Sequence, residues 1–297
     1  MSSLTQKQID RFNTEGVLCI PGFLTTQTVQ QLWTEAVRIL DELDLEKHPK
    51  TRFETGDGDH VSGLYFLESS ENVSYFDTDA FDANGVLRFP AEKAVNKIGH
   101  ALHTQNEIFR QVTFSERVNA IARDLSYTDP RVLQNMLIFK NSIEVPQDGA
   151  RDNEVPSHAD GTFLFTEPQS AVGFWLALDD CTRGNGCLTY NPGTHKTVPI
   201  SKRFVRLNGG KGGCGFKNVL KDPVSVDDPA RYRLVECPAG SLVLIHHAVL
   251  HKSEKNRLGK ATWVYTFHTI EGTARYDKKN WLQVPCTGGT NFLRLFE

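Results

Sequence analysis

The hydrophobic pattern changes its period near residue 130, and this change constrains the fold more than any other feature of the chain. Beyond that point the apolar residues form short runs that are rich in β-branched and aromatic side chains and are bounded by turns such as Asn185-Gly186 and Pro192-Gly193. Many short strands closed by tight turns favour a sheet sandwich. The predicted strands cover residues 132–139, 172–178, 187–190, 241–246 and 261–268.

The first 130 residues have mainly helical spacing. A capping box at Thr5 and Gln8 predicts the first helix, since a hydroxyl and an amide three residues apart can satisfy each other's backbone donors. Further helices are predicted to begin at Thr25 or Thr26, at Pro90 and near Ser115, and a short strand is predicted over residues 16–22. The helix from Pro90 would place Ala94, Val95, Ile98, Ala101 and Leu102 on one apolar face. We therefore expect helices packed outside the sheet sandwich.

Composition excludes several classes of function. The chain has 297 residues, with 33 Lys and Arg against 36 Asp and Glu, so no broad basic field indicates a nucleic-acid ligand. Six cysteines without a C-x-x-C pair indicate reduced thiols rather than a disulfide framework or a zinc ribbon. The amino end lacks a signal pattern and no segment reaches the ~18 apolar residues of a bilayer span. We expect a soluble intracellular, cytoplasmic protein with no membrane contact and no obligate protein partner.

Candidate metal ligands lie in two distant segments. His158-Ala-Asp160 holds an imidazole and a carboxylate two residues apart, and in a strand both side chains would project from the same face. His251 lies at the end of a later apolar strand. Two imidazoles and one carboxylate on one face of a metal leave three positions open, which is typical of non-haem Fe(II) sites that bind a co-substrate and O₂ together.

Other interpretations of the histidines remain open. Two of the three residues His246, His247 and His251 are expected to be structural histidines in the core or a turn. His100 and His103 would lie one helical turn apart, but they lack the acid of the H-E-x-x-H motif and are expected to pack on a helix face. The three candidate iron ligands would also suit Zn²⁺ in a hydrolase.

Longer blocks around the candidate ligands resemble the phytanoyl-CoA dioxygenase family. The resemblance is carried by residues 158–168, 173–180, 185–195 and 251–253, and it extends to 96–103 and 280–283. It covers nearly the whole chain. It implies one oxygenase domain over residues 1–297, with a helix-rich part at about 1–130 and a double-stranded β-helix, a cupin-like jelly roll, at about 131–297.

The resemblance also implies the chemistry. An Fe(II) centre with 2-oxoglutarate and O₂ as co-substrates would hydroxylate a C–H bond of a small-molecule or acyl substrate, CoA-linked ones included, and release succinate and CO₂. His158, Asp160 and His251 would bind the iron, and no catalytic side chain beyond these ligands is implied. The residues implied at the 2-oxoglutarate site are Lys97, Met136, Trp175 and Ser253. Met136 and Trp175 equally fit a role in the apolar core.

One position departs from the family pattern. Relatives place an arginine eleven residues after the distal histidine, where it forks onto the far carboxylate of 2-oxoglutarate, but here that position is Thr262. Lys260 would lie on the same strand face, although an ammonium is not a bidentate fork. Three outcomes remain open: Lys97 and Lys260 together bind the far carboxylate, 2-oxoglutarate binds more weakly, or the co-substrate differs. A jelly-roll protein that binds metal or ligand with little or no turnover is therefore an alternative.

Overall fold

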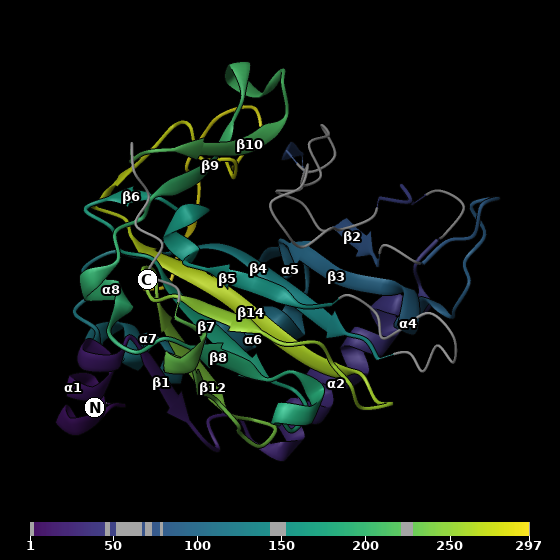
Figure 1. Ribbon diagram of the computed structural model, residues 1–297, viewed down its shortest axis with the longest axis horizontal. Helices are drawn as coiled ribbons and strands as arrows, with labels where there is room; N and C mark the ends of the chain where they lie inside the picture. Colours follow the sequence, from purple (N-terminus) through teal and green to yellow (C-terminus); the bar gives the residue numbers. More distant parts are fainter. Residues whose placement is uncertain are drawn as a thin grey trace.

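The computed structural model describes residues 3–44, 48–51, 67–68, 73–77, 80–142, 153–220 and 228–296. A long antiparallel sheet crosses the molecule and combines strands from both ends of the chain (Figure 1). In order across the sheet these strands are β1 (Val17–Ile20), β12 (Leu242–His246), β7 (Val172–Ala177), β14 (Thr262–Glu271), β4 (Pro130–Lys140), β3 (Val95–His100) and β2 (Val73–Phe76), and β16 (Leu293–Arg294) pairs with β4.

A second antiparallel sheet is smaller and has four strands, which are β11 (Arg233–Leu234), β8 (Leu188–Tyr190), β13 (His251–Ser253) and β5 (Val155–His158) in that order. Two further strand pairs are β9 (Lys202–Arg206) with β10 (Cys214–Asn218) and β6 (Thr166–Glu167) with β15 (Arg275–Tyr276). The two sheets form a jelly roll with helices outside it, which confirms the fold class predicted from the strand pattern.

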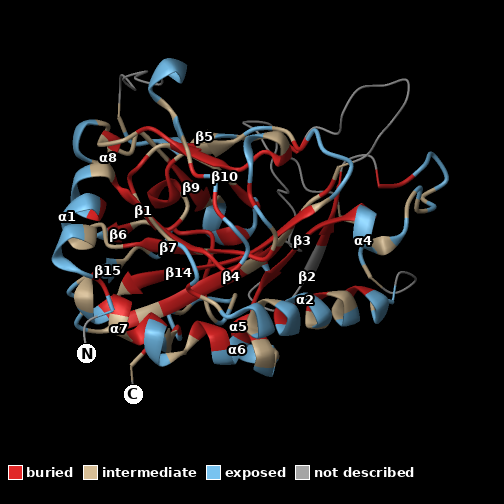
Figure 2. Cartoon of the chain, turned by 90° about the horizontal axis from the view of Figure 1, so that it is seen from below, coloured by how far each residue is buried: buried red, intermediate tan, exposed pale blue. Residues whose placement is uncertain are grey.

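Helices cover one side of the main sheet. In Figure 2, α2 (Thr26–Asp41), α5 (Leu102–Gln105) and α6 (Glu107–Thr113) lie along the lower side of the molecule, below β4. The other helices are α1 (Gln6–Glu15), α4 (Ala91–Ala94), α7 (Glu116–Asp124) and α8 (Thr194–Thr197), with 3₁₀ turns at Asp160–Thr162, Arg183–Asn185, Asn208–Gly210 and Pro229–Arg231. The hydroxyls of Thr5, Thr25 and Ser115 accept hydrogen bonds from the first turns of α1, α2 and α7, so these three helices begin where the caps predict.

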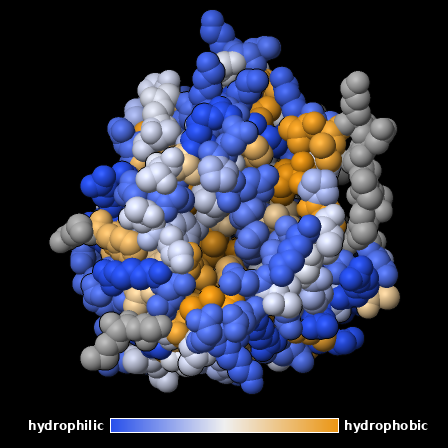
Figure 3. Space-filling view, turned by 90° about the vertical axis from the view of Figure 1, so that its left-hand side faces the viewer, coloured by the Kyte–Doolittle hydropathy of each residue, from blue (hydrophilic) through white to orange (hydrophobic). Residues whose placement is uncertain are grey.

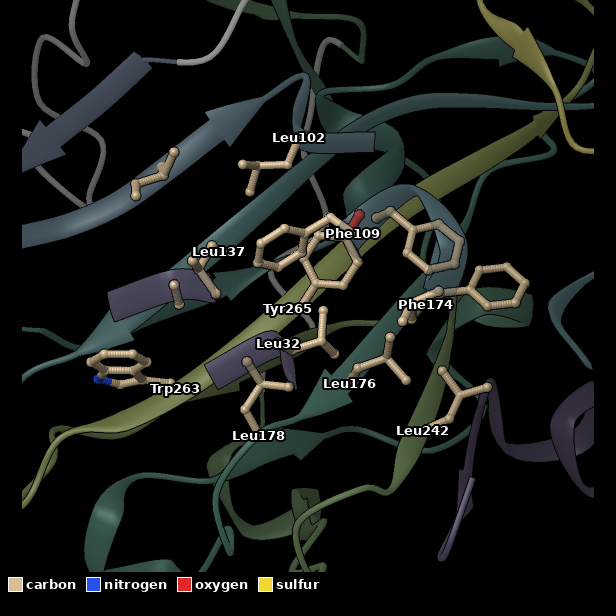
Figure 4. Packing of buried hydrophobic residues seen from close by; sticks show 14 of the residues in the cluster. Leu32, Leu102, Phe109, Leu137, Phe174, Leu176, Leu178, Leu242, Trp263 and Tyr265 are labelled. Atoms are coloured by element: carbon tan, nitrogen blue, oxygen red, sulfur yellow. The ribbon is translucent and has the colours of Figure 1, made fainter. Parts of the chain in front are cut away.

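Alternation along the strands separates the core from the other face of the main sheet. Phe174 and Leu176 on β7, and Tyr265 and Phe267 on β14, are fully buried in the largest apolar cluster, which also includes residues of the covering helices (Figure 4). Because successive residues of a strand point to opposite faces, their neighbours, such as Trp175, project away from the helices. The strands of the main sheet therefore contribute one face to the apolar core and the other face to the space between the two sheets.

The surface seen in Figure 3 is dominated by hydrophilic residues, and its apolar residues gather in separate patches. Within the described ranges, no helix has both the length and the apolar character needed to cross a membrane. All six cysteines are free thiols, as expected from their spacing. The large apolar side chains among the described residues lie mainly inside, with Trp33, Val86, Val219 and Leu258 exposed.

The helix predicted to begin at Pro90 is wrong. A single short turn, α4, is followed by strand β3, and all six residues of β3 are buried. β3 pairs with β2 on one edge and with β4 on the other, so its backbone groups bond to neighbouring strands. The apolar residues at 94, 95, 98, 101 and 102 also fit helical spacing, and here strand pairing overrides that pattern. His100 and His103 consequently lie in different elements and share no helix face.

The boundary expected near residue 130 does not divide helices from strands. β1, β2 and β3 all precede it, and all three belong to the main sheet. The helix-rich part therefore supplies three strands of the jelly roll, which ties the two parts of the chain together. A single domain over the whole chain stays a prediction.

Trp33 on α2 stacks on Trp263 of β14, with ring centroids 4.5 Å apart and an interplanar angle of 11°. Because Trp33 is still 39% exposed, Trp33→Ala should lower the free energy of unfolding by only about 1–2 kcal/mol. Trp33→Phe should retain most of the stability, since the stacked ring remains. Urea unfolding of the two variants measures this, and an equal loss in both would show that the stack itself contributes little.

Candidate metal centre

His158, Asp160 and His251 are brought together where the two strands β5 and β13 pair. His251 lies opposite His158 in this register, and one ligand atom from each of the three residues lies within 4.8 Å of the others. Oδ1 of Asp160 is 3.9 Å from Nε2 of His158 and 3.6 Å from Nε2 of His251. Asp160 lies in a 3₁₀ turn just after β5, rather than on the strand itself as expected. The turn, and not strand alternation, aims its carboxylate at the two imidazoles.

Hydrogen bonds to Nδ1 of His158 and His251 fix the tautomer of each ring. They leave the lone pair on Nε2, the nitrogen that faces Asp160. Nδ1 of His158 lies 2.8 Å from the carbonyl of Pro156, and Nδ1 of His251 lies 3.1 Å from the carbonyl of Val249. A carbonyl can only accept, so Nδ1 donates in both residues and Nε2 of the neutral ring is free to bind a metal. Burial lowers the pKa of His158 to about 4, which keeps its ring neutral at pH 7.

The carboxylate of Asp160 is buried and keeps one oxygen available. Burial alone would raise its pKa, but interactions with His268 and His251 lower the pKa below its usual range, so the group is ionised. Oδ2 accepts no well-aligned hydrogen bond within the described part of the chain, although Nε2 of His268 lies 3.3 Å away. A buried anion with an unsatisfied oxygen, beside the Nε2 atoms of two imidazoles, fits a divalent cation.

His103, His195, His246 and His247 lie outside this cluster. The rings of His246 and His247 are in tilted contact near His195, with centroids 4.1 Å apart, and burial lowers the pKa values of His246 and His247 to about 3 and 4. His103 contacts the amide of Asn135, and burial lowers its pKa to about 4. Among the described residues, the one group of three or more His, Cys, Asp or Glu side chains arranged to hold a metal is His158, Asp160 and His251.

A cavity of about 300 Å³ opens beside the three residues. Lys97, Met136, Trp175 and Ser253, the residues implied at the co-substrate site, all line it. Lys97 enters the cavity from β3. Burial lowers the pKa of its ammonium to about 7, although the negative charge of Asp77 acts to raise this pKa. A neighbouring anion would favour the charged form of this lysine. Met136 and Trp175 belong to the face of the main sheet that points away from the helices, and both line the cavity. Trp175 also packs against a second buried apolar cluster, so its two expected roles coexist.

Two further residues at this site were missed by the sequence reasoning. His268, opposite Gly173 on β7, approaches Asp160 from β14, and Lys140 ends β4 with its ammonium 2.6 Å from Oγ of Ser253. Both could have been found from strand parity, since Lys140 is four residues after Met136 and His268 is six residues after Thr262. Lys260 does not enter the cavity: its side chain is 80% exposed, and its ammonium lies 3.1 Å from Asp179.

His268 is expected to position Asp160 for the metal. Replacing an outer partner of a metal ligand typically weakens metal affinity about 10- to 100-fold, so His268→Leu should weaken Fe(II) or Mn(II) binding by this factor. His268→Gln, which keeps a donor, should recover part of the loss. Anaerobic metal titration measures both, with His195→Gln as the control. Affinity equal to that of the unaltered protein in His268→Leu would contradict this role.

Comparisons with known proteins agree with this geometry. A model of the family described as phytanoyl-CoA dioxygenase (PhyH) matches residues 12–261. A phytanoyl-CoA dioxygenase domain-containing protein 1 homolog from Caenorhabditis elegans is 36% identical over 279 residues, covering 92% of this chain and 94% of the relative. Phytanoyl-CoA dioxygenase domain-containing protein 1 from Bos taurus is 37% identical over 291 residues, covering 95% and 96%.

Solved structures share the fold at low sequence identity. EctD from S. alaskensis with 2-oxoglutarate and 5-hydroxyectoine superposes with a TM-score of 0.61 at 15% identity, covering 94% of this chain and 80% of that one. The epimerase SnoN in complex with Fe³⁺, alpha ketoglutarate and nogalamycin RO has a TM-score of 0.59 at 18% identity, covering 91% and 85%. At such identities the likeness establishes the fold alone.

Proposed function

Since the chain belongs to the phytanoyl-CoA dioxygenase family, we propose that it is an Fe(II)- and 2-oxoglutarate-dependent dioxygenase. In the proposed reaction a C–H bond of a small-molecule or acyl substrate becomes C–OH, one oxygen atom of O₂ entering the product. The other oxygen atom enters succinate, and 2-oxoglutarate loses CO₂, so its two-electron oxidation balances the reaction. Bound Fe(II) would supply the activation of O₂.

The observation that carries this proposal is the donor set of His158, Asp160 and His251 on the wall of a cavity. Both imidazoles present Nε2 and are held through Nδ1 by backbone carbonyls, so the ligands are oriented before any metal binds. Three protein ligands leave coordination positions for a keto-acid and O₂, which a closed four-ligand structural zinc site would not.

The other walls of the cavity suit an organic substrate. Phe163, Phe204 and Phe216 form an aromatic cluster with ring centroids 5.1–6.0 Å apart, and the ammonium of Lys202 lies 4.7 Å from the centroid of Phe216. An apolar wall with one cation at its edge favours a substrate that combines a hydrocarbon part with an anionic group. Acyl substrates, CoA-linked ones included, belong to this class.

The proposed function is tested by adding 2-oxoglutarate to the Fe(II)-loaded protein without oxygen. A visible charge-transfer band is expected, followed on admission of O₂ by succinate release and, with the correct substrate, a product heavier by one oxygen atom. A Zn²⁺ hydrolase on the same ligands would give neither the band nor dependence on O₂. A binding protein without turnover would give the band but no succinate.

A further inference from the structure

We propose that Lys140, together with Ser253, binds the carboxylate of 2-oxoglutarate that lies away from the metal. This assignment rests on the proposed function. Position 262, where relatives have an arginine, is a threonine here, and the proposal names the cation that would take the place of that arginine. It does not follow from the family pattern, which places the cation on another strand.

Strand register places the side chain of Lys140 next to Thr262, the position of the family's arginine. Lys140 pairs with Thr262 across β4 and β14, so their Cβ atoms are about 4.5–5.5 Å apart on the same face. Both residues line the cavity beside the metal ligands. The ammonium of Lys140 therefore occupies the neighbourhood that a longer cationic side chain at 262 would reach.

The contact with Ser253 connects Lys140 to the metal ligands. Nζ of Lys140 donates to Oγ of Ser253 at 2.6 Å, and Ser253 follows His251 by two residues on β13. Two residues of an extended strand span about 6.6 Å, a separation that a five-carbon diacid can bridge. A keto-acid bound to the metal at one end would thus meet a hydroxyl and an ammonium at the other.

The charge on Lys140 is not neutralised by the part of the protein that the structure describes. Lys140 forms no salt bridge there, and its pKa is lowered to about 8, mainly by burial, while Cys187, Glu254 and Glu154 oppose the shift. An ammonium has three donors, and one of them is used by Ser253. Since a buried unpaired charge is costly, a carboxylate ligand would relieve this cost.

The stem of Lys140 is held by a close approach of the chain. Gly186 has a φ of +70°, and a Cβ atom added there would lie 2.7 Å from Cε of Lys140 and against the carbonyl of Glu254. Only glycine fits this turn without displacing the lysine. The ammonium is therefore directed into the cavity by packing and not by a flexible chain.

Other lysines of the site have different partners. Lys260 pairs with Asp179 on the surface, and Lys202 lies over Phe216 on the aromatic wall. The charge of Lys97 interacts with that of Asp77. Lys140, in contrast, donates directly to Ser253 on β13, the strand that carries His251.

Equilibrium binding to the Mn(II)-loaded protein tests the proposal without turnover. Lys140→Met should weaken 2-oxoglutarate binding about 10- to 100-fold while Mn(II) affinity stays unchanged, because hydrogen bonds to charged groups are lost. Lys260→Met, which removes an exposed lysine outside the cavity, is the matched control and should bind 2-oxoglutarate normally. The double variant Lys140→Met with Thr262→Arg should recover most of the affinity, since the arginine restores a cation from the paired position.

A second probe isolates the distal carboxylate. 2-Oxopentanoate has the same chelating end and chain length but no distal carboxylate, so the unaltered protein and Lys140→Met should bind it equally. If the unaltered protein binds 2-oxoglutarate and Lys140→Met binds it just as well, the role of Lys140 is overturned and the proposed function stands. If the unaltered protein binds no 2-oxoglutarate, both proposals fall. Should Lys140→Met fold poorly, Lys140→Gln gives the same comparison.

Discussion

Asp160→Ala should abolish the binding of Fe(II) under conditions where the unaltered protein is saturated. Asp160 is the anionic member of the ligand set, and its Oδ1 lies within 4 Å of both imidazole Nε2 atoms. Loss of an outer partner of a ligand already costs up to about 100-fold in affinity, so loss of the carboxylate itself should cost more than about 100-fold. Succinate release should disappear with the metal.

The measurement is an anaerobic Fe(II) titration followed by the charge-transfer band with 2-oxoglutarate. Asp10→Ala removes an exposed carboxylate on α1 and is the matched control, which should behave as the unaltered protein. Asp160→Ala should still unfold cooperatively, because the alanine removes a buried charge and leaves the apolar core intact. Retention of the band in a folded Asp160→Ala protein would mean that the metal binds elsewhere.

The triad could be predicted because its residue types are rare in combination and its segments are recognisable. His158 and Asp160 are two residues apart, and His251 ends an apolar strand, so sequence spacing already places them near strand ends. What spacing could not supply is the pairing of β5 with β13, which sets His158 opposite His251. Such a contact between distant segments depends on sheet topology, and the turn that aims Asp160 is likewise a local detail of that fold.

Misassignments arose where tertiary pairing decides the structure. Residues 95–100 form a strand because β2 and β4 flank them, although their apolar spacing also fits a helix. Lys260 shares the parity of Thr262, but β14 begins only at Thr262 and Asp179 holds the ammonium of Lys260 outside. Strand parity with Met136 places Lys140 on the cavity face, but its contact with Ser253 joins two different sheets and cannot be predicted from spacing.

Phe174→Ala should lower the free energy of unfolding by about 3–5 kcal/mol, the largest effect on stability predicted here. Phe174 is fully buried and stacks on Phe267, with ring centroids 4.8 Å apart and an interplanar angle of 11°. Removing the ring leaves a cavity between the main sheet and its helices, which the packed neighbours can fill only in part. Urea unfolding measures the loss, and Val86→Ala, at a position 60% exposed, is the control.

Metal affinity in folded Phe174→Ala shows whether the core and the site act independently. Trp175, the next residue, faces the cavity, and an added Cβ at Gly173, the residue before, would lie 3.2 Å from Oδ2 of Asp160. Because alternate residues of β7 serve opposite faces, we expect Fe(II) affinity to change by less than about threefold at low temperature, where the variant stays folded. A loss of affinity that matches the loss of stability would instead mean that the aromatic core holds β7 in place against Asp160.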